Sequence, residues 1–312
     1  MTLEHPYAPI VRNVGERPAR DRNGPIRAVV FNAAGGARLE QIVRRLSLPP
    51  LNDASIILLC EADWHTARSR RREVASELAS LLGMSMAYLP EFTRPIGGAD
   101  DRANNRACMG NAILSSAPLT EVRAIAMPDP QPGRADRLRS GYFGGFAGLA
   151  ARATFGTASI WIGVAHLHSR SAPAGRGAQM AEYLDEFPKD GPAIFGGDLN
   201  STTVELKRPS SFARVIATML INPSRFRNPQ RYEPMFERLA AAGFEIDGAN
   251  APGRPTFTFS RAIPALFRPR LDWIALRGVR PAKGSAQVVT AREAFAARRF
   301  SDHDFITVAM EI

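Results

Sequence analysis

The run GGDLN at residues 196–200 lies near the middle of the chain and directly follows the apolar stretch 192–195. A short apolar run bounded by Gly and Pro is typical of a buried strand. Because residues two apart share one face of a strand, we expect Asp198 and Asn200 to point the same way and Leu199 to point into the core. Paired glycines allow other groups to approach the backbone closely. The same residue types are also typical of a turn, so the run alone leaves a turn and a functional site equally open.

The composition is that of an ordinary globular protein. The chain has 312 residues, of which 45% are hydrophobic and 22% are charged. No apolar run approaches the roughly 20 residues that cross a bilayer, and residues 1–26 lack the apolar core of a signal peptide. The two cysteines, Cys60 and Cys108, do not suggest a disulfide framework, and Cys60 is predicted to be a small core residue. We therefore expect a cytoplasmic protein with no transmembrane segment and no obligate protein partner.

The formal net charge is +10, and nearly all of the positive charge is arginine. A basic surface favours polyanions such as nucleic acid or an anionic membrane. An arginine-rich composition without any polyanion partner is the alternative interpretation. The loop 128–145 contains Arg134, Arg137 and Tyr142, which could hold a phosphate backbone and stack on a base. A solvated loop without a dedicated role is equally compatible with its sequence.

The order of apolar runs predicts one α/β domain over residues 26–312, preceded by a loose N-terminal arm over residues 1–25. The strands are expected at residues 26–32, 56–60, 107–115, 146–155, 159–167, 192–195, 271–276 and 305–312. The helices are expected at residues 37–46, 66–82, 174–187 and 291–299, with residues 203–242 mostly helical.

Polar side chains stand at or near the ends of these predicted strands. They are Asn32, Glu61, Asn111, His166, Asp198, Asn200, Asp272 and the pair Asp302-His303. Carboxylates and amides without a Cys/His cluster select a hard ion such as Mg²⁺ or Mn²⁺ over zinc. Hydrolysis of a phosphoester at neutral pH needs a metal to offset phosphate charge, a base to activate water, and a donor to the phosphoryl oxygens. This set of residues can supply all three.

The chain also resembles a known family through a series of short motifs in a fixed order. These are VVFNAAG at 29–35, LLCEAD at 58–63, GNAILSS at 110–116, VAHLHS at 164–169, GRGAQM at 175–180, GGDLNSTT at 196–203, RLDWI at 270–274 and SDHDF at 301–305. Together they resemble the endonuclease/exonuclease/phosphatase superfamily of DNase I-like phosphoesterases. The resemblance implies a four-layer sandwich, in which two packed mixed β-sheets are flanked by helices.

The resemblance also implies a metal site. Glu61 is the main metal carboxylate by this resemblance, with Asn32 beside it and Asp302 as a further contributor. The implied ion is Mg²⁺, with Mn²⁺ as the alternative. Asn111 is implied as a substrate contact.

Five further residues are implied to be catalytic, namely His166, Asp198, Asn200, Asp272 and His303. By the resemblance, Asp198 orients or deprotonates the attacking water and Asn200 binds the phosphate. His166 donates to a non-bridging oxygen, and His303 faces the scissile phosphate while Asp272 holds it. A carboxylate bonded to an imidazole fixes its tautomer and favours its cationic form. Arg176 and Gln179 are expected to buttress loops without taking part in the chemistry.

We therefore expect a divalent-metal-dependent phosphodiesterase that uses in-line attack by water, with nucleic acid as the leading substrate. A phosphatase or phosphodiesterase acting on a lipid head group or a small phosphoester is the first alternative. A non-catalytic polyanion-binding module is the second, and it is disfavoured because every expected catalytic position is filled.

Overall fold

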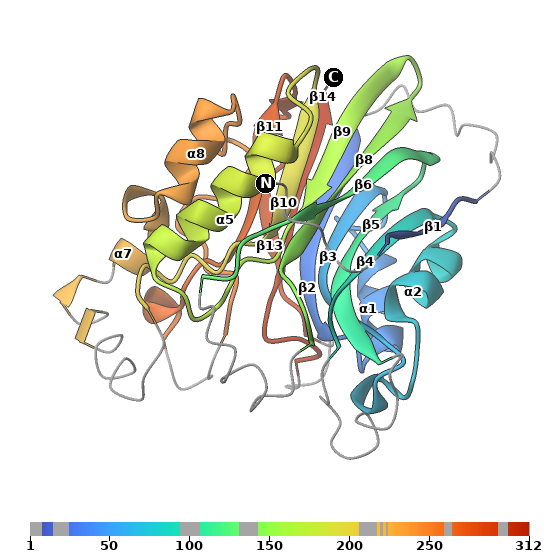
Figure 1. Ribbon diagram of the computed structural model, residues 1–312, viewed down its shortest axis with the longest axis horizontal. Helices are drawn as coiled ribbons and strands as arrows, with labels where there is room; N and C mark the ends of the chain where they lie inside the picture. The colour runs from blue at the N-terminus through green and yellow to red at the C-terminus, as the bar shows by residue number, and fades with distance from the viewer. Residues whose placement is uncertain are drawn as a thin grey trace.

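Two β-sheets pack face to face in a computed structural model of the chain, with helices on both outer sides (Figure 1). The structure describes residues 8–14, 25–93, 107–130, 143–205, 217–218, 221–222, 224–258, 264–292 and 299–311. Arg134, Arg137 and Tyr142, predicted to contact the substrate, lie outside these residues.

The larger sheet has the strand order β1-β4-β5-β3-β2-β14-β12, with β13 paired to β14 and β7 paired to β4. Its strands are β1 (Ile10–Arg12), β2 (Ile26–Gly35), β3 (Ala54–Trp64), β4 (Ser85–Thr93), β5 (Cys108–Ser115), β7 (Phe143–Gly144), β12 (Arg280–Pro281), β13 (Gln287–Val289) and β14 (Phe305–Glu311). The central pair β2 and β3 is parallel. Each has a continuous apolar centre, residues 28–31 in β2 and 56–60 in β3, as is usual for strands that are covered on both faces.

The smaller sheet has the order β11-β10-β9-β8-β6. Its strands are β6 (Leu119–Ala126), β8 (Ala147–Phe155), β9 (Ala158–Val164), β10 (Ala193–Asp198) and β11 (Asp272–Arg277). The strand that carries GGDLN, β10, lies in the interior of this sheet between β9 and β11. It is therefore held on both edges by backbone hydrogen bonds.

Three apolar clusters separate the four layers. The cluster between the sheets includes Val30 and Leu58 from the larger sheet and Val164, Ile194 and Ile274 from the smaller one. A second cluster packs the helices α1 (Leu39–Leu46) and α2 (Val74–Leu82) on the larger sheet, and a third packs α5 (Pro173–Glu186) and α8 (Met235–Ala241) on the smaller sheet (Figure 1). The predicted four-layer sandwich of two mixed β-sheets flanked by helices is confirmed.

Several predicted elements differ from the observed ones. The helix expected over 66–82 is a 3-10 turn at Ala67–Ser69 followed by α2, because Arg70 and Arg71 adopt left-handed φ values of 60° and 58° and interrupt it. Within the expected loose arm, Ile10–Arg12 forms an edge strand on β4. The described part of 203–242 holds only α7 (Ser224–Arg227), a 3-10 turn and α8 as helical elements of three residues or more.

The strands β4 and β6 are absent from the sequence-based assignment. The sequence of β4, SMAYLPEFT, contains a proline and an acid, and β6 carries exposed charges between its buried residues. Most of the helix expected at 291–299 lies outside the described residues. None of the described helices is both long enough and apolar enough to cross a membrane.

Candidate active site

The two glycines of GGDLN allow the two sheets and the neighbouring strand to come very close. A Cβ atom on Gly196 would lie 2.7 Å from Cγ2 of Val30, which belongs to the opposite sheet. A Cβ atom on Gly197 would lie 1.9 Å from the carbonyl oxygen of Ala165 in the adjacent chain segment. Any larger residue would push these segments apart. The close approach that these glycines allow therefore determines how deeply Asp198, at the end of β10, lies between the two sheets.

The backbone turns sharply after Asp198. Asn200 has a left-handed φ of 48°, its N–H donates to Oδ1 of Asp198 at 3.0 Å, and its Nδ2 donates to the carbonyl oxygen of Leu167 at 2.8 Å. A non-glycine residue in this conformation stores strain that the surrounding bonds must offset. The turn and the site, which the sequence left as alternatives, are thus the same segment.

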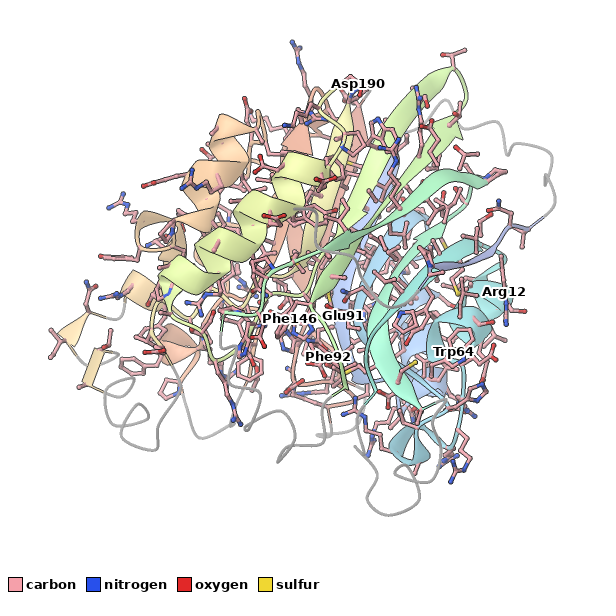
Figure 2. The ribbon with its side chains drawn as sticks, in the orientation of Figure 1. Arg12, Trp64, Glu91, Phe92, Phe146 and Asp190 are labelled. Carbon is pink, nitrogen blue, oxygen red and sulfur yellow. The ribbon has the colours of Figure 1, made fainter. Side chains whose placement is uncertain are left out.

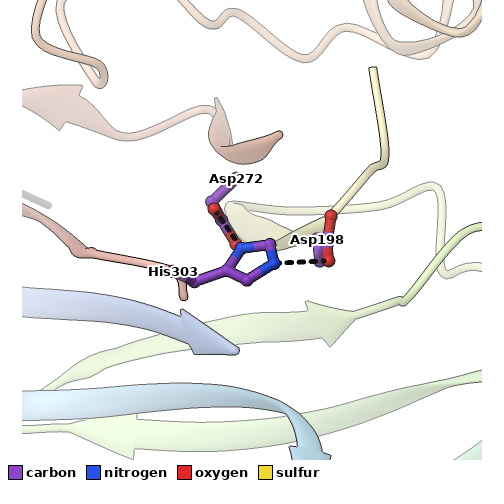
Figure 3. A group of neighbouring side chains, drawn as sticks. All are labelled: Asp198, Asp272 and His303. Atoms are coloured by element: carbon purple, nitrogen blue, oxygen red, sulfur yellow. Dashed lines mark hydrogen bonds and ion pairs between the residues drawn. The ribbon is translucent and has the colours of Figure 1, made fainter. Parts of the chain in front are cut away.

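His303 lies between two aspartates (Figure 3). Its Nδ1 is 2.8 Å from Oδ2 of Asp272, and its Nε2 is 3.6 Å from Oδ2 of Asp198. Asp198 and Asp272 are directly paired across β10 and β11, so the sheet register itself brings the two carboxylates together. The backbone N–H of His303 donates to Oγ of Ser301, and that hydroxyl donates to the carbonyl oxygen of Asn32. His303 is therefore held from both sheets, its ring by Asp272 and its backbone through Ser301 by Asn32.

The charges of this group depend on one another. Burial alone would lower the pKa of His303, but the carboxylates of Asp272 and Asp198 outweigh it and raise that pKa to about 10. Burial raises the pKa of Asp198 to about 6, although the charge of His303 opposes the rise. The two carboxylates therefore favour the cationic form of this imidazole, and the bond to Asp272 fixes its orientation.

Glu61 and Asn32 form the second side of the site. Nδ2 of Asn32 is 3.3 Å from Oε1 of Glu61 and 2.9 Å from Oδ2 of Asp198, so one amide joins the two acids. Burial would raise the pKa of Glu61, but the nearby His166 and His303 reverse the effect and the pKa is lowered. Glu61 also has a left-handed φ of 52°, and 28% of its side chain is exposed. It is an ionised carboxylate within reach of solvent.

His166 lies between three acids without being hydrogen-bonded to any of them. Its Nε2 is 3.7 Å from Oδ2 of Asp198 and 3.9 Å from Oε1 of Glu61, and its Nδ1 is 4.0 Å from Oε2 of Glu91. Burial lowers the pKa of His166, but the charges of Asp198, Glu61 and Glu91 raise it further than burial lowers it. Neither ring nitrogen of His166 has a hydrogen-bond partner among the described residues.

Glu91 was missed by the sequence-based prediction. It lies on β4, beside Phe92 and Phe146 (Figure 2), and is fully buried. Its Oε1 accepts a bond from the N–H of Ala147 at 3.3 Å, and its Oε2 has no hydrogen-bond partner among the described residues. Burial raises its pKa to about 8. The signal available in the sequence was an acid within the apolar run 87–92, which is rare in a strand unless the acid has a partner.

Cys60 links the two sheets directly beneath the site. Its Sγ accepts a hydrogen bond from the backbone N–H of Asp198 at 3.4 Å and lies 3.7 Å from the carbonyl oxygen of Ala165. The residue is fully buried, as predicted for a small core residue. Its thiol supplies an acceptor to the backbone N–H of Asp198 itself.

Arg176 and Gln179 hold loops at a distance from the reacting groups. Arg176 forms a fully buried, two-point ion pair with Glu233, and Oε1 of Glu233 accepts a bond from the N–H of Thr203 at 2.7 Å. Gln179 accepts from the N–H of His168 and donates to the carbonyl oxygen of Pro128. These contacts fix the segments that follow β9 and β10, in agreement with the predicted buttressing role.

The structure brings most of the predicted site residues together. The residues that meet are Asn32, Glu61, His166, Asp198, Asn200, Asp272 and His303. Asn111 lies behind them, fully buried, with Nδ2 donating to the carbonyl oxygen of Ala147. Asp302 does not join the cluster, because its side chain is exposed and accepts only a long 3.5 Å contact from Oγ of Ser301. It acts on His303 through its charge alone.

Two groups of ligand atoms are suited to a metal ion. Asp198, Asp272 and His303 offer atoms that lie within 4.8 Å of one another. Both ring nitrogens of His303 already face carboxylates, so an ion there would have to displace those contacts. Glu61, with Asn32 beside it, offers an ionised and partly exposed carboxylate, which fits an oxygen-preferring divalent cation.

Solved structures of low sequence identity share this fold. An endonuclease/exonuclease/phosphatase from Beutenbergia cavernae DSM 12333 aligns with a TM-score of 0.59 at 16% identity, covering 92% of this chain and 71% of that chain. TDP2 from D. rerio, complexed with a single-strand DNA product, aligns at 0.54 and 16% identity over 93% and 100%. Sphingomyelinase C from Streptomyces griseocarneus aligns at 0.50 and 15% identity over 92% and 99%.

No curated protein matches the chain in sequence. The model of the Endonuclease/Exonuclease/phosphatase family matches residues 29–303, which is most of the chain and includes every residue of the cluster described above. This match, together with the shared sandwich and the acid–imidazole cluster at the ends of its strands, shows that the protein belongs to the endonuclease/exonuclease/phosphatase family and is a hydrolase of phosphoester bonds.

Proposed function

We propose that the protein is a divalent-metal-dependent phosphodiesterase that attacks a phosphodiester with water, and that its leading substrate is nucleic acid. The observation that carries this proposal is the position of Asp198. One carboxylate lies within 4 Å of two imidazoles and accepts a hydrogen bond from the amide of Asn32. A candidate base, two candidate donors and, through Asn32, a candidate metal-binding carboxylate thus lie together, and phosphoester hydrolysis needs groups of these kinds.

Glu61 and Asn32 would hold the cation, which we propose to be Mg²⁺ or Mn²⁺. The ion would offset the negative charge of the phosphate. Glu61 suits this role because it is ionised and partly exposed, whereas Asp198 and Asp272 are buried and engaged with His303.

Asp198 would orient the attacking water and accept its proton. Its neighbour His303 stays cationic, because its Nδ1 is bonded to Asp272 and its pKa is raised to about 10. A cation that is already fixed in place stabilises the charge that builds up on the phosphoryl oxygens without having to reorganise. His166 would donate a second hydrogen bond to the phosphate from the Glu61 side, and Asn200 would complete the contacts.

Two observations favour nucleic acid. The net charge of +10 attracts polyanions, and a structure of the same fold, TDP2, is complexed with a single-strand DNA product. A lipid head group or a small phosphoester is the second candidate, and the shared fold with sphingomyelinase C supports it. The substrate therefore has to be decided by assay.

The test compares four substrates: plasmid DNA, RNA, a chromogenic phosphodiester and a phosphomonoester, each with Mg²⁺ or with EDTA. We expect Mg²⁺-dependent cleavage of nucleic acid and of the chromogenic diester. Asp198→Asn should abolish both activities. Asp185→Asn, which removes the same charge from an exposed position on α5, is the matched control and should be active. Cleavage of small esters alone would favour the second candidate, and activity that survives in Asp198→Asn would refute the assignment of the base.

A further inference from the structure

A cavity of about 410 Å³ lies beside the metal-binding side of the site, and none of the roles above uses it. The turn after β2 and the start of α1 form one wall, and the segment after β3 forms the other. Its lining residues are Ala37, Arg38, Glu40, Gln41, Arg68 and Arg70. Three of the six carry guanidinium groups.

The acids near the cavity are already matched by other arginines. Glu40 is bonded to Arg72 at 2.5 Å, and that bond lowers the pKa of Glu40. Arg68 makes two bonds to Asp63, at 2.6 and 2.7 Å. Among the described residues, no carboxylate lies within ion-pair distance of Arg38 or Arg70. Neither arginine is therefore engaged in an ion pair there, although Arg70 acts on Glu40, which also lines the cavity, through its charge at longer range.

Arg68 lines the cavity and also packs against the end of the strand that carries Asn32. Gly35, at the end of β2, pairs with Ala62, the residue after Glu61. A Cβ atom on Gly35 would lie 2.5 Å from Nε of Arg68, so this guanidinium packs directly on the β2 end that also carries Asn32. The charge of Arg68 also acts on Glu61 and helps to lower its pKa. The basic cavity therefore lies close to the proposed metal carboxylate.

We propose that this cavity binds a phosphate group of a nucleic acid strand next to the phosphate that is hydrolysed. This inference rests on the proposed phosphodiesterase function. Guanidinium groups form paired, charge-assisted hydrogen bonds with phosphate oxygens. Arg38 and Arg70 have this capacity free, while Arg68 is held in place by Asp63. A small ester or a lipid with a single phosphate has no second phosphate to occupy the cavity, so the site distinguishes a strand from these substrates.

The test uses the double variant Arg38→Ala/Arg70→Asn in the full chain. Asn is chosen at position 70 because the backbone there has a left-handed φ of 60°, which Asn tolerates better than Ala does. KM is measured for a single-stranded oligonucleotide and for a chromogenic phosphodiester, with Mg²⁺ present. We expect the ratio of the first KM to the second to rise about tenfold or more, in line with the loss of charge-assisted bonds. The salt dependence of oligonucleotide binding should also become shallower by about one unit of slope for each arginine removed.

Arg44→Ala is the control, because Arg44 is exposed on α1 and does not line the cavity. This substitution removes one positive charge, as Arg70→Asn alone does, whereas the double variant removes two. An unchanged KM ratio in the double variant, or one equal to that of Arg44→Ala, would overturn the inference while leaving the phosphodiesterase function intact. Equal loss on both substrates would also overturn it. If the wild-type protein cleaves neither substrate, the proposed function itself fails, and the variants are not needed to show it. Should the double variant fold poorly, Arg70→Asn alone, at an exposed position, decides the same question by the same KM ratio.

Discussion

The two histidines of the site are held in opposite ways. His303 is bonded to Asp272 at 2.8 Å, and its backbone is tied to Ser301. His166 lies 3.7 to 4.0 Å from Asp198, Glu61 and Glu91 and forms no hydrogen bond with any of them. One imidazole is fixed by a single close carboxylate, whereas the other is surrounded by charges that do not fix it.

This difference indicates two kinds of donor. Asp272 and Asp198 favour the cationic form of His303 in the free protein and raise its pKa to about 10. The pKa of His166 depends on several surrounding charges, including that of Glu91, a buried acid whose own pKa is raised to about 8. A fixed cation suits the point where charge develops, and an unbonded imidazole suits contact with the substrate. Four predictions test this division.

The largest effect is expected from His303→Asn. Loss of a fixed cation and of its bond to Asp272 should lower kcat by about 10³-fold or more, as for removal of a principal acid–base or charge-stabilising group. Steady-state kinetics on a chromogenic diester would measure it. His65→Asn, at a partly exposed position outside the cluster, is the control. A loss of less than about tenfold would remove His303 from the proposed chemistry.

His166→Asn is expected to have a smaller effect, about 10²-fold in kcat/KM, because Asn retains a donor and no bonded carboxylate is left unpaired. The same assay would show whether KM rises as well, as expected for a group that contacts the substrate. If His166→Asn were as damaging as His303→Asn, the two imidazoles would not have the separate roles that their contacts indicate.

Glu91 should make the folded state less stable as the pH rises. Its pKa is raised from 4.5 to about 8, so the folded state holds a proton that the unfolded state has lost between these two values. The free energy of unfolding should therefore fall between about pH 4.5 and 8. His166 and Glu61 face the same space, and their charges act on Glu91. The pH dependence that Glu91 itself contributes therefore has to be isolated by comparing the wild type with a variant. Glu91→Gln keeps the shape and removes this proton.

Measured by urea unfolding in EDTA, the stability of Glu91→Gln should fall less steeply across this range than that of the wild type, and it should exceed the wild type at pH 8. The expected difference is on the order of a few kcal/mol. Glu237→Gln, at an exposed position on α8, gives the control slope. Parallel stability curves for Glu91→Gln and the wild type would show that the buried acid is not protonated at neutral pH.

The smallest effect is expected from Cys60→Ala. The change leaves the backbone N–H of Asp198 without its acceptor and should cost about 1–2 kcal/mol of unfolding free energy, with a fall in kcat of about tenfold or less. Cys108→Ala removes a buried thiol from the outer cluster of the larger sheet and serves as the control. Equal kcat values for the two variants would mean that Cys60 is only a packing residue.

Much of the site could be predicted because its chemistry stands at strand ends. The apolar runs before Asn32, Glu61 and Asp198 were long enough to identify as buried strands, and the polar residue followed directly. The prediction failed where that pattern is absent. Glu91 lies within β4, and the proline and the acid in this strand prevent its identification as an apolar run. The helix α2 begins eight residues later than expected because Arg70 and Arg71 turn the backbone.

The sequence by itself determined the four-layer class, the family and most of the residues that meet in the candidate site, because each depends on short patterns and on their order along the chain. Only the tertiary structure decided which groups touch. Cys60 meets Asp198 across 138 residues, Asn32 meets Asp198 across 166, and Glu91 faces His166 from the other sheet. Such contacts are set by how two sheets pack and by the space that Gly196 and Gly197 leave between them, and no local pattern records that distance.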